Sequence, residues 1–164
     1  MPLPAIDPAQ YSAQLAAKVA VYKESFAPFA LPEPAVFPSA PCHYRLRAEF
    51  RVWHHDAGLD YAMFDPDNPK RPILMQEFPA ASQSICAAMV ALRAAVLASE
   101  VLKKRLYAVE FLATLSGDLL ITLIYHRRLD ADWETAARLL AADLKAAIIG
   151  RSKRSEERRV GKEC

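Results

Sequence analysis

Between residues 45 and 53 the side chains alternate strictly, with an apolar group at every second position. One face of such a strand would hold Leu46, Ala48, Phe50 and Val52, and the other Arg45, Arg47, Glu49, Arg51 and Trp53. A period of two is the geometry of a β-strand with one face in a core and the other in water. The alternation therefore predicts an antiparallel sheet whose outer face displays three arginines.

Capping residues and prolines define the segment before this strand. Asp7 followed by Pro8 predicts a helix with Asp7 as N-cap, ending near Phe26. Its apolar stripe would consist of Tyr11, Leu15, Val19 and Tyr22. Residues 27–42 contain five prolines, which exclude a helix or a central strand, so we expect an extended strap over the surface.

After residue 53 the pattern predicts strands and helices in turn. A turn at 54–58, a return strand at 59–65, a second turn at 65–72 and a short strand at 73–78 would come first. They would be followed by helices over 80–98 and 99–105, a hairpin over 106–126 turning at Gly117, a helix over 129–148, and a strand beginning at 148–150. Adjacent antiparallel β-hairpins packed with helices on one side make an α+β fold.

Two of these helices have apolar stripes that define the expected core. The stripe of the 80–98 helix is Ile85, Met89, Leu92 and Val96, and that of the 129–148 helix is Leu139, Leu140, Leu144 and Ile148. Either Asp130 or Asp132 would cap the second helix.

Composition limits the classes of protein that fit. With 164 residues, 53% hydrophobic, the chain is sized for one domain, and its net charge of +2 confines any nucleic-acid surface to a local patch. There is no apolar run long enough for a membrane span and no secretory signal, so the cytoplasm is expected. Three scattered cysteines predict reduced thiols, without a disulfide framework or metal-ligand spacing.

No catalytic constellation is apparent. The chain has four glycines and no glycine-rich phosphate loop, and His54 and His55 would point to opposite sides of the chain. His126, beside two arginines, is interpreted as a satisfied histidine at the rim of the sheet. We therefore predict no catalytic, cofactor-binding or metal-binding residue in this chain.

The arginine face suggests RNA binding. Arg45, Arg47 and Arg51 would be spaced at roughly 7 and 14 Å, which suits successive phosphates, and Trp53 offers a flat surface for a base. The alternative is a solvated face with ordinary ion pairs. Tyr107 follows the basic run 103–105 and would stack on a base, or else join Val109, Phe111, Ala113 and Leu115 on the buried face.

The last eleven residues, RSEERRVGKEC, look like the translation of a DNA-sequencing adapter. We therefore expect residues 154–164 to be a non-native disordered tail, and residues 1–153 to be the genuine domain, cut near Lys153. A genuine solvated tail is the alternative.

The sequence around the arginine strand, HYRLRAEFRVWH, resembles the bacterial tRNA (uracil-5-)-methyltransferase family. Further similar segments follow in the same order: APF at 27–29, FPAAS at 78–82, LATLSG at 112–117, YHRRLD at 125–130 and IIGRSK at 148–153. The likeness runs from about residue 7 to residue 153. Family members are methyl transferases that act on tRNA, so the resemblance implies an enzyme.

The resemblance implies methyl transfer from S-adenosylmethionine to C5 of a uridine in the tRNA T loop. It places the catalytic cysteine, the catalytic glutamate and the site for the methyl donor in a C-terminal Rossmann-like domain. We expect that domain to be absent from this chain. The N-terminal region would bind the tRNA T arm through Arg45, Arg47, Arg51, Trp53 and Tyr107, as a monomer that is inactive alone. The alternatives are a free-standing RNA-binding module and a domain with no RNA role. The gene sequence beyond codon 153 distinguishes a methyltransferase fragment from a free-standing module.

Overall fold

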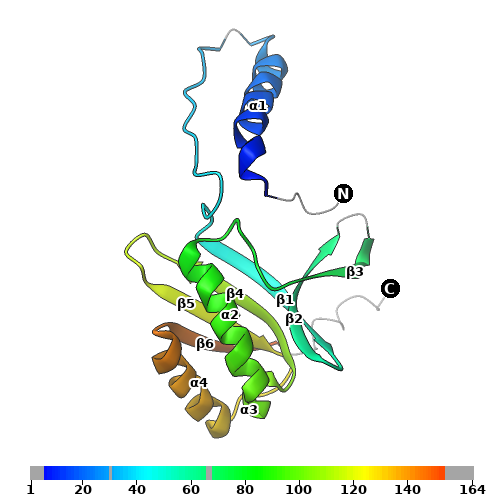
Figure 1. Ribbon diagram of the computed structural model, residues 1–164, viewed down its shortest axis with the longest axis vertical. Helices are drawn as coiled ribbons and strands as arrows, with labels where there is room; N and C mark the ends of the chain where they lie inside the picture. The colour runs from blue at the N-terminus through cyan, green and yellow to red at the C-terminus, as the bar shows by residue number, and fades with distance from the viewer. Residues whose placement is uncertain (1–5, 30, 66–67, 154–164) are drawn as a thin grey trace, which may run out of the picture.

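The computed structural model describes residues 6–29, 31–65 and 68–153. Within them, one six-stranded sheet has the order β3-β2-β1-β4-β5-β6. Its strands are β1 (Arg47–His55), β2 (Gly58–Asp65), β3 (Asn68–Met75), β4 (Leu106–Ala113), β5 (Leu119–Tyr125) and β6 (Ala147–Ser152). Neighbouring strands are antiparallel except β5 and β6, which are parallel (Figure 1). The predicted α+β fold and both hairpins are confirmed.

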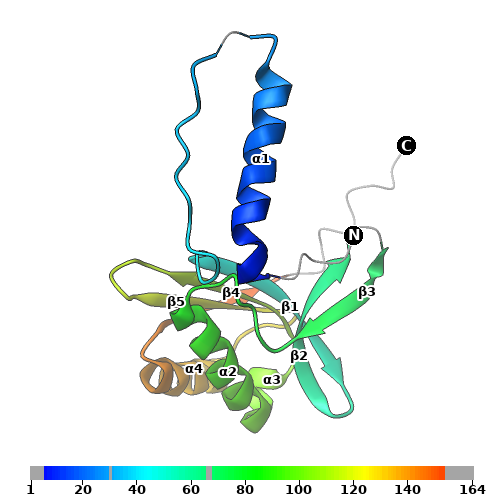
Figure 2. The ribbon, with the colours of Figure 1, turned by 45° about the horizontal axis from the view of Figure 1, so that its top comes forward.

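Three helices lie on one side of the sheet (Figures 1 and 2): α2 (Gln83–Ala98), α3 (Glu100–Lys103) and α4 (Ala131–Leu144). The predicted stripe of α2 is confirmed, since Ile85, Met89, Leu92 and Val96 are all buried. They meet an aromatic cluster on the sheet, where Phe50 lies 5.4 Å from Tyr61 and 6.3 Å from Phe111, ring centroid to ring centroid. Burial of this apolar face is the main stabilising contribution to the fold.

The alternation in β1 is confirmed. Ala48, Phe50 and Val52 are buried, and the residues between them are exposed. The strand begins at Arg47, two residues later than the alternation suggested. Arg45 precedes it in an isolated parallel bridge, donating its N–H to Ala80 O and accepting from Ser82 N–H at 2.8 and 2.7 Å. These bonds fix the start of β1 against the start of α2.

Further boundaries also differ from the prediction, and two of them have a clear physical reason. β3 begins at Asn68, inside the segment predicted as a turn, because an edge strand tolerates prolines in its sequence. The helix predicted over 129–148 ends at Leu144, where Lys145 adopts φ 50° and starts the connection to β6.

The predicted stripe of that last helix is therefore wrong in two places. Leu139 is 70% exposed, and Ile148 lies on β6 rather than on α4. Trp133, Ala137 and Leu140 are the buried residues of α4, whose N-cap is Asp130. Asp130 Oδ1 accepts the backbone N–H of Trp133 at 2.9 Å, which settles the choice between the two candidate caps.

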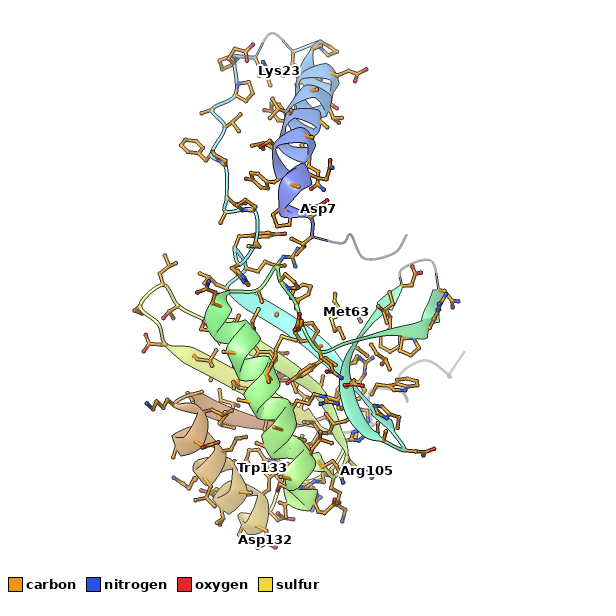
Figure 3. The ribbon with its side chains drawn as sticks, in the orientation of Figure 1. Asp7, Lys23, Met63, Arg105, Asp132 and Trp133 are labelled. Atoms are coloured by element: carbon orange, nitrogen blue, oxygen red, sulfur yellow. The ribbon has the colours of Figure 1, made fainter. Side chains whose placement is uncertain are left out.

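The N-terminal segment forms an arm that projects away from the sheet (Figures 1 and 2). A 3₁₀ turn, Pro8–Gln10, capped by Asp7 as predicted, leads into α1 (Tyr11–Phe26), and the proline-rich strap returns beside it. In Figure 3 Asp7 marks the base of the arm and Lys23 its far end, where Lys23 pairs with Glu33 at 2.6 Å. The strap is extended, as expected, and lies beside α1, none of whose residues is buried (Figure 2).

Candidate nucleic-acid interface

The face of the sheet opposite α2 and α4 carries the outward side chains of β1. The register of β1 and β4 sets Arg47 beside Leu112, Glu49 beside Glu110 and Arg51 beside Ala108. On β6, the residue in line with Ile124 of β5 is Arg151. Because side chains directly opposite one another share a face, these groups line a single outer surface.

Tyr107 joins that surface through a break in the register. Leu106 pairs with Tyr125 and Ala108 with Ile124, so Tyr107 is an extra residue in β4. A β-bulge of this kind interrupts the alternation and re-aims a side chain. The alternative that placed Tyr107 on the buried face with Val109 and Phe111 is therefore wrong, and Leu115, in the turn, is 93% exposed.

The Tyr107 ring lies between two other planar groups. The Arg51 guanidinium carbon is 3.8 Å from the ring centroid, and the His126 ring is stacked at 3.9 Å with an interplanar angle of 23°. Two planar groups this close to one centroid would overlap if they shared a face of the ring, so they cover opposite faces. Lys153 Nζ lies 5.7 Å from the same centroid. We call Arg51, Tyr107 and His126 the aromatic stack.

Charges around the stack are mixed, with cations at its edge. Partial burial lowers the pKa of Arg51, an effect that Glu49 opposes, and Arg51 stays charged at neutral pH. Glu49 and Glu110 face each other across β1 and β4, an unfavourable pair that Arg47, 4.0 Å from Glu49, and Arg151, 3.8 Å from Glu110, partly neutralise.

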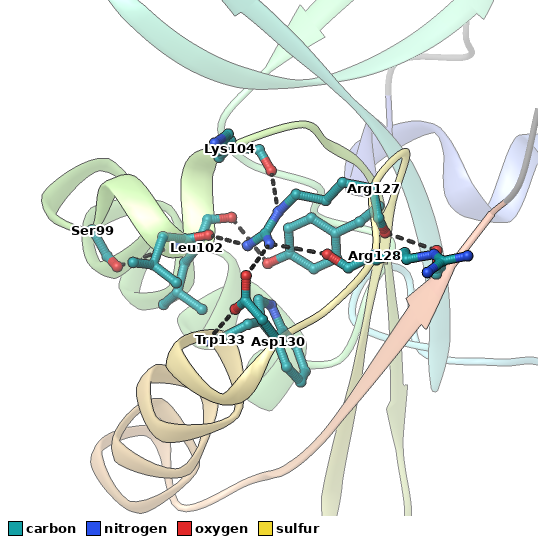
Figure 4. Close-up of polar contacts among 10 residues, drawn as sticks. Ser99, Leu102, Lys104, Arg127, Arg128, Asp130 and Trp133 are labelled. Carbon is teal, nitrogen blue, oxygen red and sulfur yellow. Dashed lines mark hydrogen bonds and ion pairs between the residues drawn. The ribbon is translucent and has the colours of Figure 1, made fainter.

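Other basic residues of the sequence do not join this surface in the same way. Arg127 is a structural residue: its side chain is 12% exposed and donates to backbone carbonyls of neighbouring segments (Figure 4). Lys103 pairs with Glu100 on α3. Basic residues that are neighbours in the sequence thus differ in the structure, since some make structural contacts and others are exposed.

Of the five residues predicted to bind RNA, Arg51 and Tyr107 come into direct contact with each other. Along β1, Trp53 lies two residues and Arg47 four residues from Arg51, and Trp53 is 40% exposed. Arg45 lies before the strand. The sequence did not identify His126 or Lys153 as partners of Tyr107; the only signal was that YHRRLD and IIGRSK both contain basic residues next to a predicted strand.

The described residues also bear on nucleophilic and metal chemistry. The Cys86 thiol lies 3.3 Å from Phe78 O and 3.4 Å from Ala81 O, and burial raises its pKa, which favours the unreactive protonated form. Within residues 6–29, 31–65 and 68–153, no group of three or more His, Cys, Asp or Glu side chains is placed to hold a metal ion. In the same part of the chain no helix has the length and apolarity to cross a bilayer.

Comparison with known proteins matches this chain to one family. The family model described as tRNA (Uracil-5-)-methyltransferase matches residues 10–160, which includes part of the segment we interpret as foreign. That segment lies outside the described residues, so its interpretation stays a prediction.

Curated relatives carry the name tRNA/tmRNA (uracil-C(5))-methyltransferase. Those from Aromatoleum aromaticum and Azoarcus sp. (strain BH72) are 63% and 61% identical over 156 residues, 95% of this chain but 42% and 43% of their own length. The relative from Dechloromonas aromatica is 55% identical over 153 residues, 93% of this chain and 42% of its own. The chain thus spans about two fifths of the relatives that it matches. On these matches, it belongs to the tRNA (uracil-5-)-methyltransferase family.

Proposed function

We propose that this chain is the tRNA-binding part of an S-adenosylmethionine-dependent methyltransferase that forms 5-methyluridine in the tRNA T loop, acting as a monomer in the cytoplasm. Its outer sheet face would bind the T arm. The observation that carries the proposal is the aromatic stack, with Lys153 at its edge and Arg47 on the same surface. The names of the relatives supply the RNA class, tRNA or tmRNA.

Stacking and charge together suit a folded RNA loop. Proteins recognise such loops by stacking unpaired bases on aromatic rings and arginine planes, while cations meet the phosphates. Because both faces of Tyr107 are covered, a base would extend the stack at one end or separate its members. Arg45 and Trp53 would extend the same surface along β1 toward either end.

The described residues do not fit an S-adenosylmethionine site. Gly58 begins β2 after a hairpin turn, Gly117 lies in the other hairpin turn and Gly150 lies inside β6, so none of them opens a glycine-rich loop between a strand and a helix. We propose that the methyl donor and the catalytic cysteine and glutamate belong to the part of the longer relatives that this chain does not match. On this basis the chain alone transfers no methyl group, and labelling of tRNA by it would contradict the proposal.

Arg51→Ala tests the surface. We expect it to weaken tRNA binding roughly tenfold and to reduce the slope of log K against log salt by about 0.7–0.9. Arg138→Ala is the matched control, since Arg138 is exposed on α4 across the sheet and pairs only locally with Glu134. Filter binding at several salt concentrations measures both variants. Equal affinities for the two variants would exclude the outer face as the RNA surface.

A further inference from the structure

Arg127 directly follows His126 and lies beneath the corner of the sheet that carries the aromatic stack. Its Nη2 donates to Val101 O at 2.7 Å, its Nε to Lys104 O at 3.0 Å and its Nη1 to Arg128 O at 3.1 Å. Its Nη1 also lies 3.5 Å from Asp130 Oδ2 (Figure 4). One guanidinium thus joins the α3–β4 connection to the β5–α4 connection.

Both connections lead directly to the rings of the stack. Lys104, whose carbonyl accepts from Arg127, is three residues before Tyr107, and the backbone N–H of His126 donates to Arg105 O at 3.1 Å. Arg105 has φ 56°, a left-handed conformation that costs a non-glycine residue roughly 1 kcal/mol or more. The surrounding bonds must impose this conformation, and the Arg127–Lys104 bond is adjacent to it.

The backbone of Arg127 extends the connection to β6. Its carbonyl accepts from Ser152 Oγ at 2.7 Å, and the next residue, Lys153, donates its N–H to Tyr125 O at 2.8 Å. The segments that carry Tyr107, His126 and Lys153 are therefore joined by hydrogen bonds of Arg127 and of nearby Tyr125.

We propose that Arg127 is a positioning residue for RNA recognition: it fixes the two chain corners that hold Tyr107 against His126 and Arg51. This inference rests on the proposed function, since it assigns Arg127 a role in the same surface. A lysine keeps the charge but has neither the planar fork nor the separate donors that reach three carbonyls at once. Arg127→Lys thus removes the geometry while retaining the cation.

The direct readout of the stack is NMR of the His126 ring protons in the complete chain. Stacking on Tyr107 shifts these protons by the ring current, and Tyr107→Leu defines their position without it. In Arg127→Lys we expect them to move toward the Tyr107→Leu position. Arg93→Lys is the matched control, because Arg93 is a partly buried arginine whose Nε binds Leu59 O and Asp60, both at 2.9 Å, away from the stack.

Binding of unmodified tRNA by the same variants gives the second readout. Arg127→Lys and Tyr107→Leu should each weaken binding roughly tenfold. The double variant should bind no worse than Tyr107→Leu alone, because both changes disrupt the same aromatic stack. Arg93→Lys should combine additively with Tyr107→Leu.

The outcomes separate the inference from the proposed function. Unchanged His126 resonances in folded Arg127→Lys protein would overturn the positioning role, as would additive losses in the double variant. Displaced resonances with unchanged tRNA affinity would uphold the positioning of the stack but overturn its role in RNA binding. If Arg127→Lys does not fold, Ser152→Ala removes one bond to the Arg127 carbonyl, and unshifted His126 resonances there would refute the inference.

Discussion

Replacing Gly150 by alanine should destabilise the sheet through one defined collision. Gly150 lies inside β6. A Cβ added there would collide with Cη2 of Trp133, and the same Cβ would lie 2.6 Å from Cζ2 of that indole and 2.5 Å from Cδ1 of Leu129. The Trp133 side chain cannot withdraw easily, because it is 8% exposed and its ring packs edge-on against Tyr125 at 5.8 Å.

The size of the effect follows from overpacking. Adding a carbon to a filled core site costs about 1–3 kcal/mol, because neighbours leave their preferred rotamers. For a domain of this size that lowers Tm by roughly 3–10 °C. Thermal unfolding followed by circular dichroism measures the shift, and chemical denaturation gives the free energy of unfolding.

A double-mutant cycle tests the stated cause. Trp133→Phe removes the two indole carbons in the collision, so the double variant should lose less stability than the sum of the two single variants. Gly117→Ala is the matched control: its Cβ would meet nothing within 4 Å, and its cost comes from φ +97°. Trp133→Phe should not rescue it. Additive losses for Gly150→Ala and Trp133→Phe would refute the steric explanation.

Three further predictions concern stability and reactivity. Burial raises the pKa of Tyr125 from 10.0 to about 12, so stability present below pH 10 should fall between pH 10 and 12, by up to about 2–3 kcal/mol, and Tyr125→Phe should flatten this part of the pH dependence of Tm. A chain starting at Pro41 should keep its Tm within about 3 °C, because α1 buries no residue and the core begins at Ala48; a larger loss would show that the arm supports the sheet. Iodoacetamide should alkylate Cys86 more slowly than free cysteine at pH 7, in a variant whose other cysteines are serine; an equal rate would contradict a protonated thiol.

Local patterns sufficed for the elements of this fold whose determinants are close in sequence. The two-residue period of β1, the Asp7–Pro8 start of the first helix and the turn at Gly117 each depend on neighbours within a few positions. Boundaries failed where tertiary position decides. Pro69 and Pro72 fit β3 only because it is an edge strand, and an isolated sequence does not say which strand will be at the edge.

Tyr107 shows why the candidate site was only partly predictable. Strict alternation from Val109 back through β4 assigns Tyr107 to the core, and that assignment fails because the bulge inserts one residue against β5. Nothing in LYAVEF marks the bulge, since its cause lies in the pairing partner. The resemblance supported Arg51 and Tyr107 as candidate RNA-binding residues, but their contact depends on the register of β1 with β4.

The arginines make the same point about charge. Arg51 and Arg127 both occur beside aromatic residues and other basic groups, and nothing local separates them in the sequence. Their roles diverge because β1 directs Arg51 outward, whereas the two corners around Arg127 present carbonyls that accept its N–H groups. Lys153 reaches Tyr107, 46 positions away, only because α4 returns the chain so that β6 runs parallel to β5. The outer surface is thus assembled by strand order: residues that are dispersed in the sequence meet there because the sheet fixes which strands are neighbours.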